Sequence, residues 1–311
     1  MKTVDRALFV DDGAAIVTIA GNRVEKHVLQ RAADGNLVPK RLWTARIRYC
    51  SALVEAPQQG TIIATDTSGR HFGLCNASGG ILWQTAPVGE GDRGVLLADG
   101  TFLFATWHGL LQRLDPRDGR EVSGLFQAGS QLRKLHLTRG KDLLTVVRLI
   151  PAISSRDPVG EVLCGLDIGT MAMRELMGNT FTSGMYVSPD GRKILCRYLV
   201  TDPAGELRAR PSKWVVKDTM TGAGLCERIV TPPPAFAQPV WSPDGLWIAF
   251  SSRDAHLFVS ADTLAPVALV PGTFPQRPVF NPAGGFVCLC RTDDAVIAPV
   301  GELFRWPFPD E

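Results

Sequence analysis

Seven turns centred on glycine recur along the 311-residue chain, and their near-regular spacing constrains the fold more than any other feature. The most complete copy lies in segment 237–263, where Ser242-Pro243-Asp244-Gly245 separates a short extended run from the apolar run 246–251. Proline fixes φ and glycine accepts a positive φ, so this motif predicts a tight turn between two strands. Successive turn glycines are 47, 40, 40, 51, 54 and 39 residues apart, and they are Gly13, Gly60, Gly100, Gly140, Gly191, Gly245 and Gly284.

A second series of turns follows the first, 17 to 31 residues further along each segment. Its members are Asp34-Gly35, Gly79-Gly80, Asp118-Gly119, Gly169-Thr170, Thr221-Gly222, Asp262-Thr263 and Val300-Gly301. A repeat of about 40–45 residues with four strands is typical of a propeller blade. We therefore predict an all-β fold, a single seven-bladed β-propeller of four-stranded antiparallel blades over residues 1–311. The expected blades are about 3–45, 46–88, 89–129, 130–179, 180–235, 236–273 and 274–311.

Two of the turns also match a known blade pattern. Trp241-Ser242-Pro243-Asp244-Gly245 precedes the apolar run 246–250, and residues 187–191 repeat it as Val-Ser-Pro-Asp-Gly. This pattern resembles the blades of TolB-like and WD-repeat propellers. Segments 77–83 and 114–120 look like the outer hairpin of quinoprotein-type repeats. The resemblance implies a propeller superfamily, and it points to no particular functional family within it.

The composition restricts the classes of partner. Lys and Arg total 33 against 31 Asp and Glu, a net charge of +2, so bulk electrostatics gives no reason to expect nucleic acid. The N-terminal residues reach a charged pair before any apolar run, which predicts neither a signal peptide nor a membrane anchor. Seven cysteines, mostly in strand-like runs, fit reduced thiols. We expect a cytoplasmic protein without membrane insertion.

No motif for a phosphate loop, a paired-histidine metal site, a Gly-x-Ser-x-Gly elbow or a calcium loop is present in the sequence. We accordingly expect no cofactor, no metal site and no catalytic residue. Two functional classes stay open. A non-enzymatic platform for protein–protein interaction, or a subunit of a larger complex, is favoured. The alternative is a cytosolic propeller enzyme, such as a lactonase acting on an anionic sugar-type substrate at the channel mouth, and it rests on resemblance of fold alone.

Basic residues recur where the innermost strand of a blade should begin, six places before the first turn pair. They are Arg6, Arg93, Arg133 and Arg277 in blades one, three, four and seven, with Gln238 in blade six. Four arginines at one structural position would crowd one mouth of the ring and focus positive potential there. One hypothesis is that the mouth binds an acidic segment of another protein or a small anion. The other is that each arginine forms an ion pair with the neighbouring blade.

Long hairpins between the second and third strands are expected in blades four and five. The first has its tip at 155–160 with Arg156, and the second returns through 206–218 with Arg208, Arg210 and Trp214. Arginine and tryptophan are enriched in interface hot spots, so we predict that the paired hairpins form a protruding protein-docking site with Trp214 exposed. The alternative is that both are merely elongated surface loops.

Overall fold

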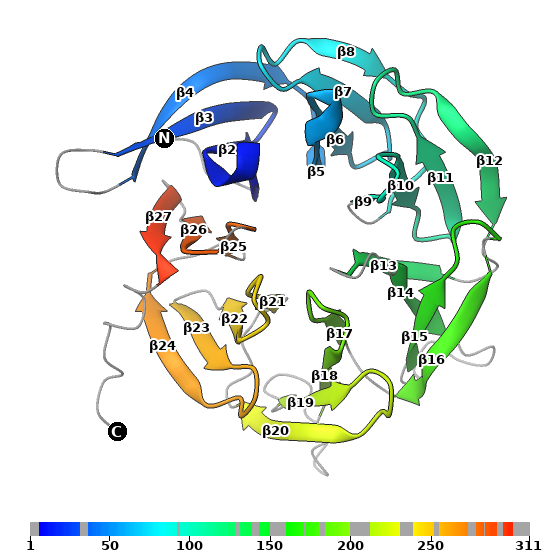
Figure 1. Cartoon of the computed structure of the whole chain (residues 1–311), viewed down its shortest axis with the longest axis vertical. Helices are drawn as coiled ribbons and strands as arrows, with labels where there is room; N and C mark the ends of the chain where they lie inside the picture. Colours follow the sequence, from blue (N-terminus) through cyan, green and yellow to red (C-terminus); the bar gives the residue numbers. More distant parts are fainter. Residues whose placement is uncertain are drawn as a thin grey trace.

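A computed structural model describes residues 6–31, 37–91, 94–127, 131–138, 143–149, 160–170, 172–180, 184–199, 212–230, 239–251, 255–272, 278–282, 284–290 and 295–300. Seven antiparallel sheets are arranged around a common centre, and the colours run once around the ring from the N-terminus to the C-terminus (Figure 1). The expected seven-bladed, all-β architecture is confirmed. Two single 3-10 turns are described, η1 (Asp11–Gly13) and η2 (Pro57–Gln59), and Val300, the last described residue, is helical.

The first three sheets, blades one to three, contain twelve strands. Blade one consists of β1 (Arg6–Val10), β2 (Ala15–Ala20), β3 (Arg23–Arg31) and β4 (Leu37–Arg46). Blade two consists of β5 (Cys50–Ala56), β6 (Thr61–Asp66), β7 (His71–Cys75) and β8 (Ile81–Gln84). Blade three consists of β9 (Val95–Leu96), β10 (Phe102–Ala105), β11 (Leu110–Leu114) and β12 (Glu121–Gln127).

The remaining four sheets are blades four to seven. Blade four consists of β13 (Gln131–Leu137), β14 (Leu143–Leu149), β15 (Gly160–Leu166) and β16 (Met173–Thr180). Blade five consists of β17 (Gly184–Val187), β18 (Lys193–Leu199), β19 (Ser212–Asp218) and β20 (Gly224–Val230). Blade six consists of β21 (Val240–Trp241), β22 (Trp247–Ser251), β23 (Ala255–Ser260) and β24 (Pro266–Pro271). Blade seven has β25 (Val279–Phe280), β26 (Phe286–Cys290) and β27 (Ala295–Pro299) among the described residues.

Each sheet follows the chain order, with its first strand nearest the centre of the ring (Figure 1). The second strands β2, β6, β10 and β22 are mostly apolar and buried, as in the sequence Ala-Ile-Val-Thr-Ile-Ala of β2. A strand that alternates its side chains between two faces needs apolar residues on both when a neighbouring blade covers each face. The core therefore consists of layers between adjacent blades.

Blade seven packs directly against blade one. Phe9 and Ile16 of blade one form a buried cluster with Cys288 of β26. The turn glycine Gly13 has φ near 90°, and a Cβ there would overlap the side chain of Asn281 in the matching turn of blade seven. Among the described residues no strand is exchanged between the two blades, so the ring closes by side-chain packing. The fourth strand expected near 302–308 lies outside the described residues.

In the part of the chain that the structure describes, no helix has the length and apolar character needed to cross a membrane.

Candidate functional site

The arginines expected at the channel mouth are described only in part. Arg6 is the first residue of β1, as predicted, and its side chain is partly buried. The backbone of Arg133 lies near the start of β13. The side chain of Arg133 and all of Arg93, Gln238 and Arg277 lie outside the described residues. Convergence of these groups on one mouth of the ring stays a prediction.

Of the docking residues predicted for the paired hairpins, only Trp214 lies within the described part of the chain. Their tips, with Arg156, Arg208 and Arg210, lie outside the described residues, and the docking role of the tips stays a prediction. Trp214 is in β19, is 1% exposed, and packs edge-on against Phe250 of blade six with ring centroids 4.8 Å apart. The prediction that Trp214 is an exposed contact residue is wrong. Neighbouring residues of a strand point to opposite faces, so the polar residues before Trp214 say nothing about its own face.

Two tryptophans fill the outer part of the junctions between blades one and two and between blades two and three. The indole Nε1–H of Trp43 in β4 donates to the carbonyl of Asn76 at 2.9 Å. That of Trp83 in β8 donates to the carbonyl of Pro116 at 2.8 Å. In both cases the acceptor lies 33 residues after the tryptophan, in the turn before the outermost strand of the next blade. The two junctions therefore repeat one packing arrangement.

A glycine in the same turn completes this arrangement. Gly79 and Gly119 lie 36 residues after Trp43 and Trp83, and they have φ values of 73° and 71°. A Cβ at either glycine would overlap the facing indole ring. We refer to Trp43–Gly79 and Trp83–Gly119 as the docking pairs. Glycine serves two needs there, because it accepts the left-handed conformation and leaves room for the ring.

The junction between blades five and six has the same backbone arrangement with different side chains. Arg228 of β20 and Leu264 are also 36 residues apart. The Leu264 N–H donates to the Ser260 carbonyl at 2.9 Å, as the Gly119 N–H does to Asp115 at 2.8 Å. Leu264 has φ near 55°, in the left-handed region, although it is not glycine. Arg228 and Leu264 therefore occupy the positions of a docking pair.

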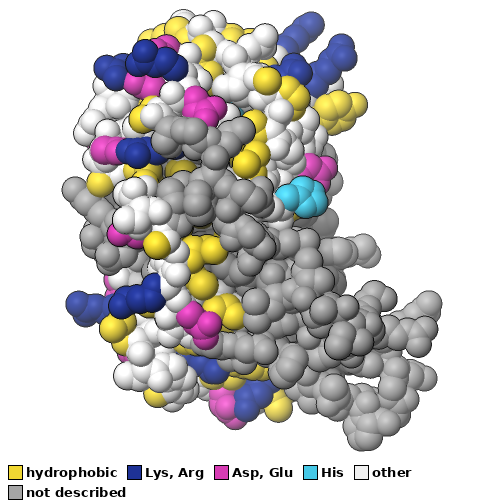
Figure 2. Space-filling view, turned by 90° about the vertical axis from the view of Figure 1, so that its right-hand side faces the viewer, with side chains coloured by type: hydrophobic (Ala, Val, Ile, Leu, Met, Phe, Trp, Pro, Cys, Tyr) yellow, Lys and Arg dark blue, Asp and Glu magenta, His cyan; other side chains and the backbone are white. Residues whose placement is uncertain are grey.

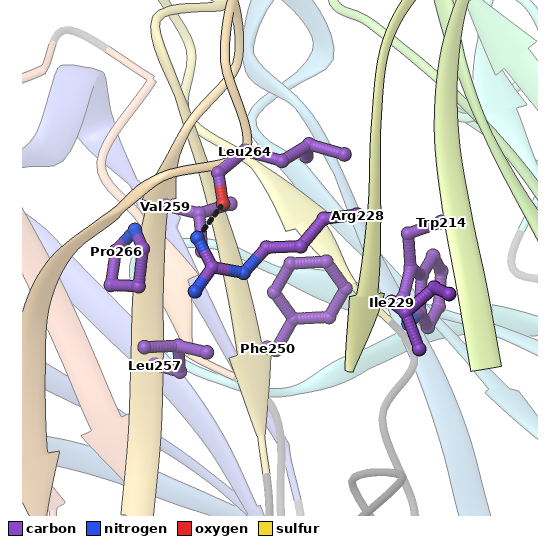
Figure 3. A pocket seen from close by; sticks show the side chains of 8 residues that line it. All are labelled: Trp214, Arg228, Ile229, Phe250, Leu257, Val259, Leu264 and Pro266. Carbon is purple, nitrogen blue, oxygen red and sulfur yellow. Dashed lines mark hydrogen bonds between the residues drawn. The ribbon is translucent and has the colours of Figure 1, made fainter. Parts of the chain in front are cut away.

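A cleft of about 150 Å³ lies at this junction. Its walls come from β20 of blade five and from β22, β23, β24 and the preceding turn of blade six (Figure 3). Figure 3 shows the Arg228 side chain extending over the Phe250 ring, with Leu257 and Pro266 beyond it and Ile229 on the opposite side. The lining residues are Trp214, Arg228, Ile229, Phe250, Leu257, Val259, Leu264 and Pro266. The cleft is apolar apart from one guanidinium and one indole N–H.

The Arg228 guanidinium has unused hydrogen-bonding capacity in the cleft. Arg228 donates one long hydrogen bond, from Nη1 to the carbonyl of Leu264 at 3.4 Å, and pairs with no carboxylate among the described residues. Its side chain is exposed, so its remaining donors are available to an acceptor that enters the cleft. The Nε1 of Trp214 has no acceptor within the described part of the chain, but that atom is itself buried.

Two of the histidines, His71 and His256, are packed inside the blades. His71 is fully buried, with Nδ1 2.9 Å from Thr65 Oγ1 and its ring edge-on to Phe104 at 4.6 Å. Burial lowers the pKa of His71 to about 4, and burial lowers the pKa of His256 to about 3. Both rings are therefore neutral at physiological pH. No group of three or more His, Cys, Asp or Glu side chains suited to a metal ion is found among the described residues.

Exposed aliphatic residues recur on the outermost strands of blades one to three. Leu42, Leu82 and Val122 are spaced by 40 residues and are 54%, 54% and 47% exposed. Leu42 and Leu82 each precede the tryptophan of a docking pair, so they lie at the same position of the repeat. Elsewhere charges are mixed: on the side of the ring formed by blades three and four, basic and acidic side chains alternate with apolar ones (Figure 2).

Comparison with solved structures finds rings of the same kind. Hydrazine synthase from Kuenenia stuttgartiensis matches with a TM-score of 0.69 and 13% identity, covering 96% of this chain and 97% of that one. The β-propeller domain of Myceliophteria thermophila Cps50 (Swd1) matches with a TM-score of 0.65 and 12% identity, covering 96% and 98%. The chain is a β-propeller. The Dos1 propeller is also similar, with a TM-score of 0.58 and 10% identity, covering 96% and 83%.

These identities are low, so the similarity to the solved propellers concerns the fold alone. No protein-family model matches the chain, and no curated protein sequence matches it. Propellers commonly serve as interaction platforms, and their functions depend on the residues that each ring presents rather than on the ring itself. The function of this propeller must accordingly be inferred from its own side chains.

Proposed function

We propose that this propeller is a non-enzymatic interaction platform that binds another protein along the outermost strands of blades one to three. The observation that supports the proposal is the recurrence of exposed Leu42, Leu82 and Val122 at one position of the repeat. Single exposed aliphatic residues are common on protein surfaces and need no explanation. Three of them at one repeat position give neighbouring blades the same apolar contact point, which suits a partner that extends across several blades.

Strand β8 supplies the backbone for such a contact. The outermost strand of a blade has one edge without a neighbouring strand in its sheet, and such an edge accepts an extended peptide by strand addition. Charged residues or prolines commonly protect such edges. Lys40 and Arg41 lie in β4, and Pro266 and Pro271 lie in β24. The sequence of β8, Ile-Leu-Trp-Gln, has neither. The edge of β8 is therefore the preferred contact in this proposal.

The proposal also includes the compartment and a second contact. We place the protein in the cytoplasm, and the six free thiols of the described cysteines support a reducing environment. An acidic segment of the partner would bind the predicted arginine mouth. Raising the salt concentration should weaken that contact and leave the apolar contact on the outer strands largely unchanged.

The test is a comparison of two triple variants during purification from the native host. The first replaces Leu42, Leu82 and Val122 by Ser. The second replaces Met220, Leu225 and Leu246 by Ser; these residues are also exposed, by 79%, 50% and 54%, but lie on blades five and six. Both should fold, because exposed substitutions usually change stability by less than about 0.5 kcal/mol each.

We expect the wild type and the second variant to retain the same copurifying protein, measured by quantitative mass spectrometry, and the first variant to lose it. Direct titration of that purified protein should show affinity reduced at least about tenfold for the first variant. Equal affinity for the wild type and the first variant would contradict the proposal.

A further inference from the structure

The cleft between blades five and six follows from an exchange of aromatic residues between adjacent strands. In blade two, Trp83 on the outermost strand pairs across the sheet with Gly73, whose missing side chain leaves room for the indole. In blade five, Arg228 takes the outer position and pairs with Trp214 on β19. Residues paired in this way lie on the same face of the sheet. The indole ring of blade five therefore lies one strand closer to the centre than that of blade two, and the long side chain of Arg228 covers the space outside it.

Leu264 forms part of the cleft at a conformational cost. Its counterparts Gly79, Gly119 and Gly222 have φ between 71° and 73°, which glycine adopts without strain. A leucine there is strained, and strained residues of this kind concentrate at ligand sites. The Leu264 side chain is 2% exposed and packs with Trp214, Phe250 and Val259. The leucine thus gives the cleft an apolar wall, and its carbonyl holds the Arg228 guanidinium in place.

The charge of the cleft points to an anion. Arg228 presents a planar fork of donors, of which a single one is used by a described residue, and its stem lies on apolar surface (Figure 3). A guanidinium binds a carboxylate through two parallel hydrogen bonds, and the pair is stronger beside apolar walls than in open water. Trp214 lines the same cleft, so the resonance of its indole reports on a ligand bound there.

The size of the cleft limits what accompanies the carboxylate. A volume of about 150 Å³ lined by Phe250, Leu257, Val259 and Leu264 is comparable to that of engineered apolar cavities that bind benzene. A single six-membered ring or a branched aliphatic group fits, and a nucleotide or a sugar phosphate is too large and too polar. We propose that this cleft binds a carboxylate carried on one small apolar group. Its location on blades five and six separates it from the protein-binding strands of blades one to three, so either proposal can fail without the other.

Two sources could supply such a group, a free aryl or branched aliphatic acid and the C-terminal residue of a peptide chain. Phenylacetate represents the first, and a pentapeptide ending in phenylalanine with a free carboxylate represents the second. Phenylacetamide and the C-terminally amidated peptide are the neutral controls. Binding would be measured by titration followed through the indole ¹H–¹⁵N resonances, with that of Trp214 assigned from the Trp214→Phe variant.

We expect at least one of the two acids to shift the Trp214 resonance with a dissociation constant of about 1 mM or tighter, and its neutral control to bind at least tenfold more weakly. Arg228→Gln should weaken binding at least tenfold. Arg120→Gln, at an exposed arginine of blade three, should not change it. Because Arg228→Gln could also alter packing, Leu257→Trp provides a second test: it fills the cleft, keeps the arginine, and should abolish binding.

The pattern of responses identifies the source. Binding of phenylacetate supports a free acid, and binding of the peptide alone supports a chain end. Equal binding of acids and amides would overturn the inference, as would undiminished binding to Arg228→Gln or the absence of a Trp214 shift with both acids up to about ten times the expected dissociation constant.

Discussion

The junctions between blades two and three and between blades five and six share a backbone arrangement and differ in what fills it. At the first, Trp83 packs over Gly119 and donates to the adjacent turn. At the second, Arg228 reaches the carbonyl of Leu264 and leaves an apolar cleft beneath it. Spacing is the same in both, 36 residues from one partner to the other. The repeat thus fixes where adjacent blades meet, and two side chains decide whether the junction is filled or open.

The largest difference should appear when each outer-strand residue is removed. Trp43 belongs to the first docking pair and is 7% exposed. Its replacement by Ala should lower the free energy of unfolding by about 4 kcal/mol, which is typical for a buried aromatic residue. Arg228→Ala removes an exposed side chain with one long hydrogen bond and should cost less than about 1 kcal/mol. Urea unfolding followed by tryptophan fluorescence measures both. Similar costs at the two positions would contradict the comparison.

Replacing the turn glycines by alanine should also cost more stability where an indole ring fills the junction. Gly119 and Gly222 both have φ of 71°, but a Cβ at Gly119 meets the Trp83 ring, and one at Gly222 meets open space. Gly222→Ala should cost about 1 kcal/mol of strain alone. Gly119→Ala should cost about 3 kcal/mol, because the ring must also move. Matched thermal and urea unfolding of the two variants tests this, and equal losses would show that Trp83 can shift freely.

Acid should weaken the packing between blades two and three through His71. Burial holds the pKa of this ring at about 4 in the folded protein, against about 6.5 in the unfolded chain. The unfolded state therefore binds a proton first as pH falls, and stability that is complete above pH 6.5 is lost down to about pH 4. Between pH 6.5 and pH 5 the loss should be about 2 kcal/mol.

The control for the pH dependence is His71→Gln, which cannot gain this charge. Its unfolding free energy should fall by about 2 kcal/mol less than that of the wild type over the same pH interval, measured by urea unfolding at each pH. The same slope in both proteins would remove His71 as the cause.

The smallest effect concerns the conformation of Leu264. Ordinarily glycine destabilises a folded position relative to alanine, but at φ near 55° the order should reverse. Both variants lose the buried leucine side chain, and Leu264→Gly should be about 1 kcal/mol more stable than Leu264→Ala. Differential unfolding in urea resolves such a difference. Greater stability of the alanine variant would show that the turn relaxes when the leucine is removed.

The sequence predicted the ring because its turns are local features. Glycines such as Gly191 and Gly245 accept positive φ whatever surrounds them, so their spacing counts the blades directly. The docking pairs were also visible in the sequence, since Trp43 and Trp83 each precede a turn glycine by 36 residues. This spacing is the signal in the sequence that predicts the filled junctions.

The cleft could not be predicted in this way. Leucine almost never has a positive φ on its own, and Leu264 adopts it only because the surrounding core holds the side chain. The burial of Trp214 depends on which face of β19 meets blade six, and the charged residues before it in the sequence carry no information about that face. Both features are set by packing between distant segments rather than by local sequence.

The two junctions differ in packing, and a crystal pressurised with xenon tests this difference most directly. Xenon enters apolar cavities of this size and cannot enter a space filled by an indole ring. We expect a xenon peak in the cleft beside Phe250 and Leu264, and none between Trp83 and Gly119. A cleft without xenon, closed by the side chains of Leu257 and Ile229, or equal occupancy of both junctions, would contradict it.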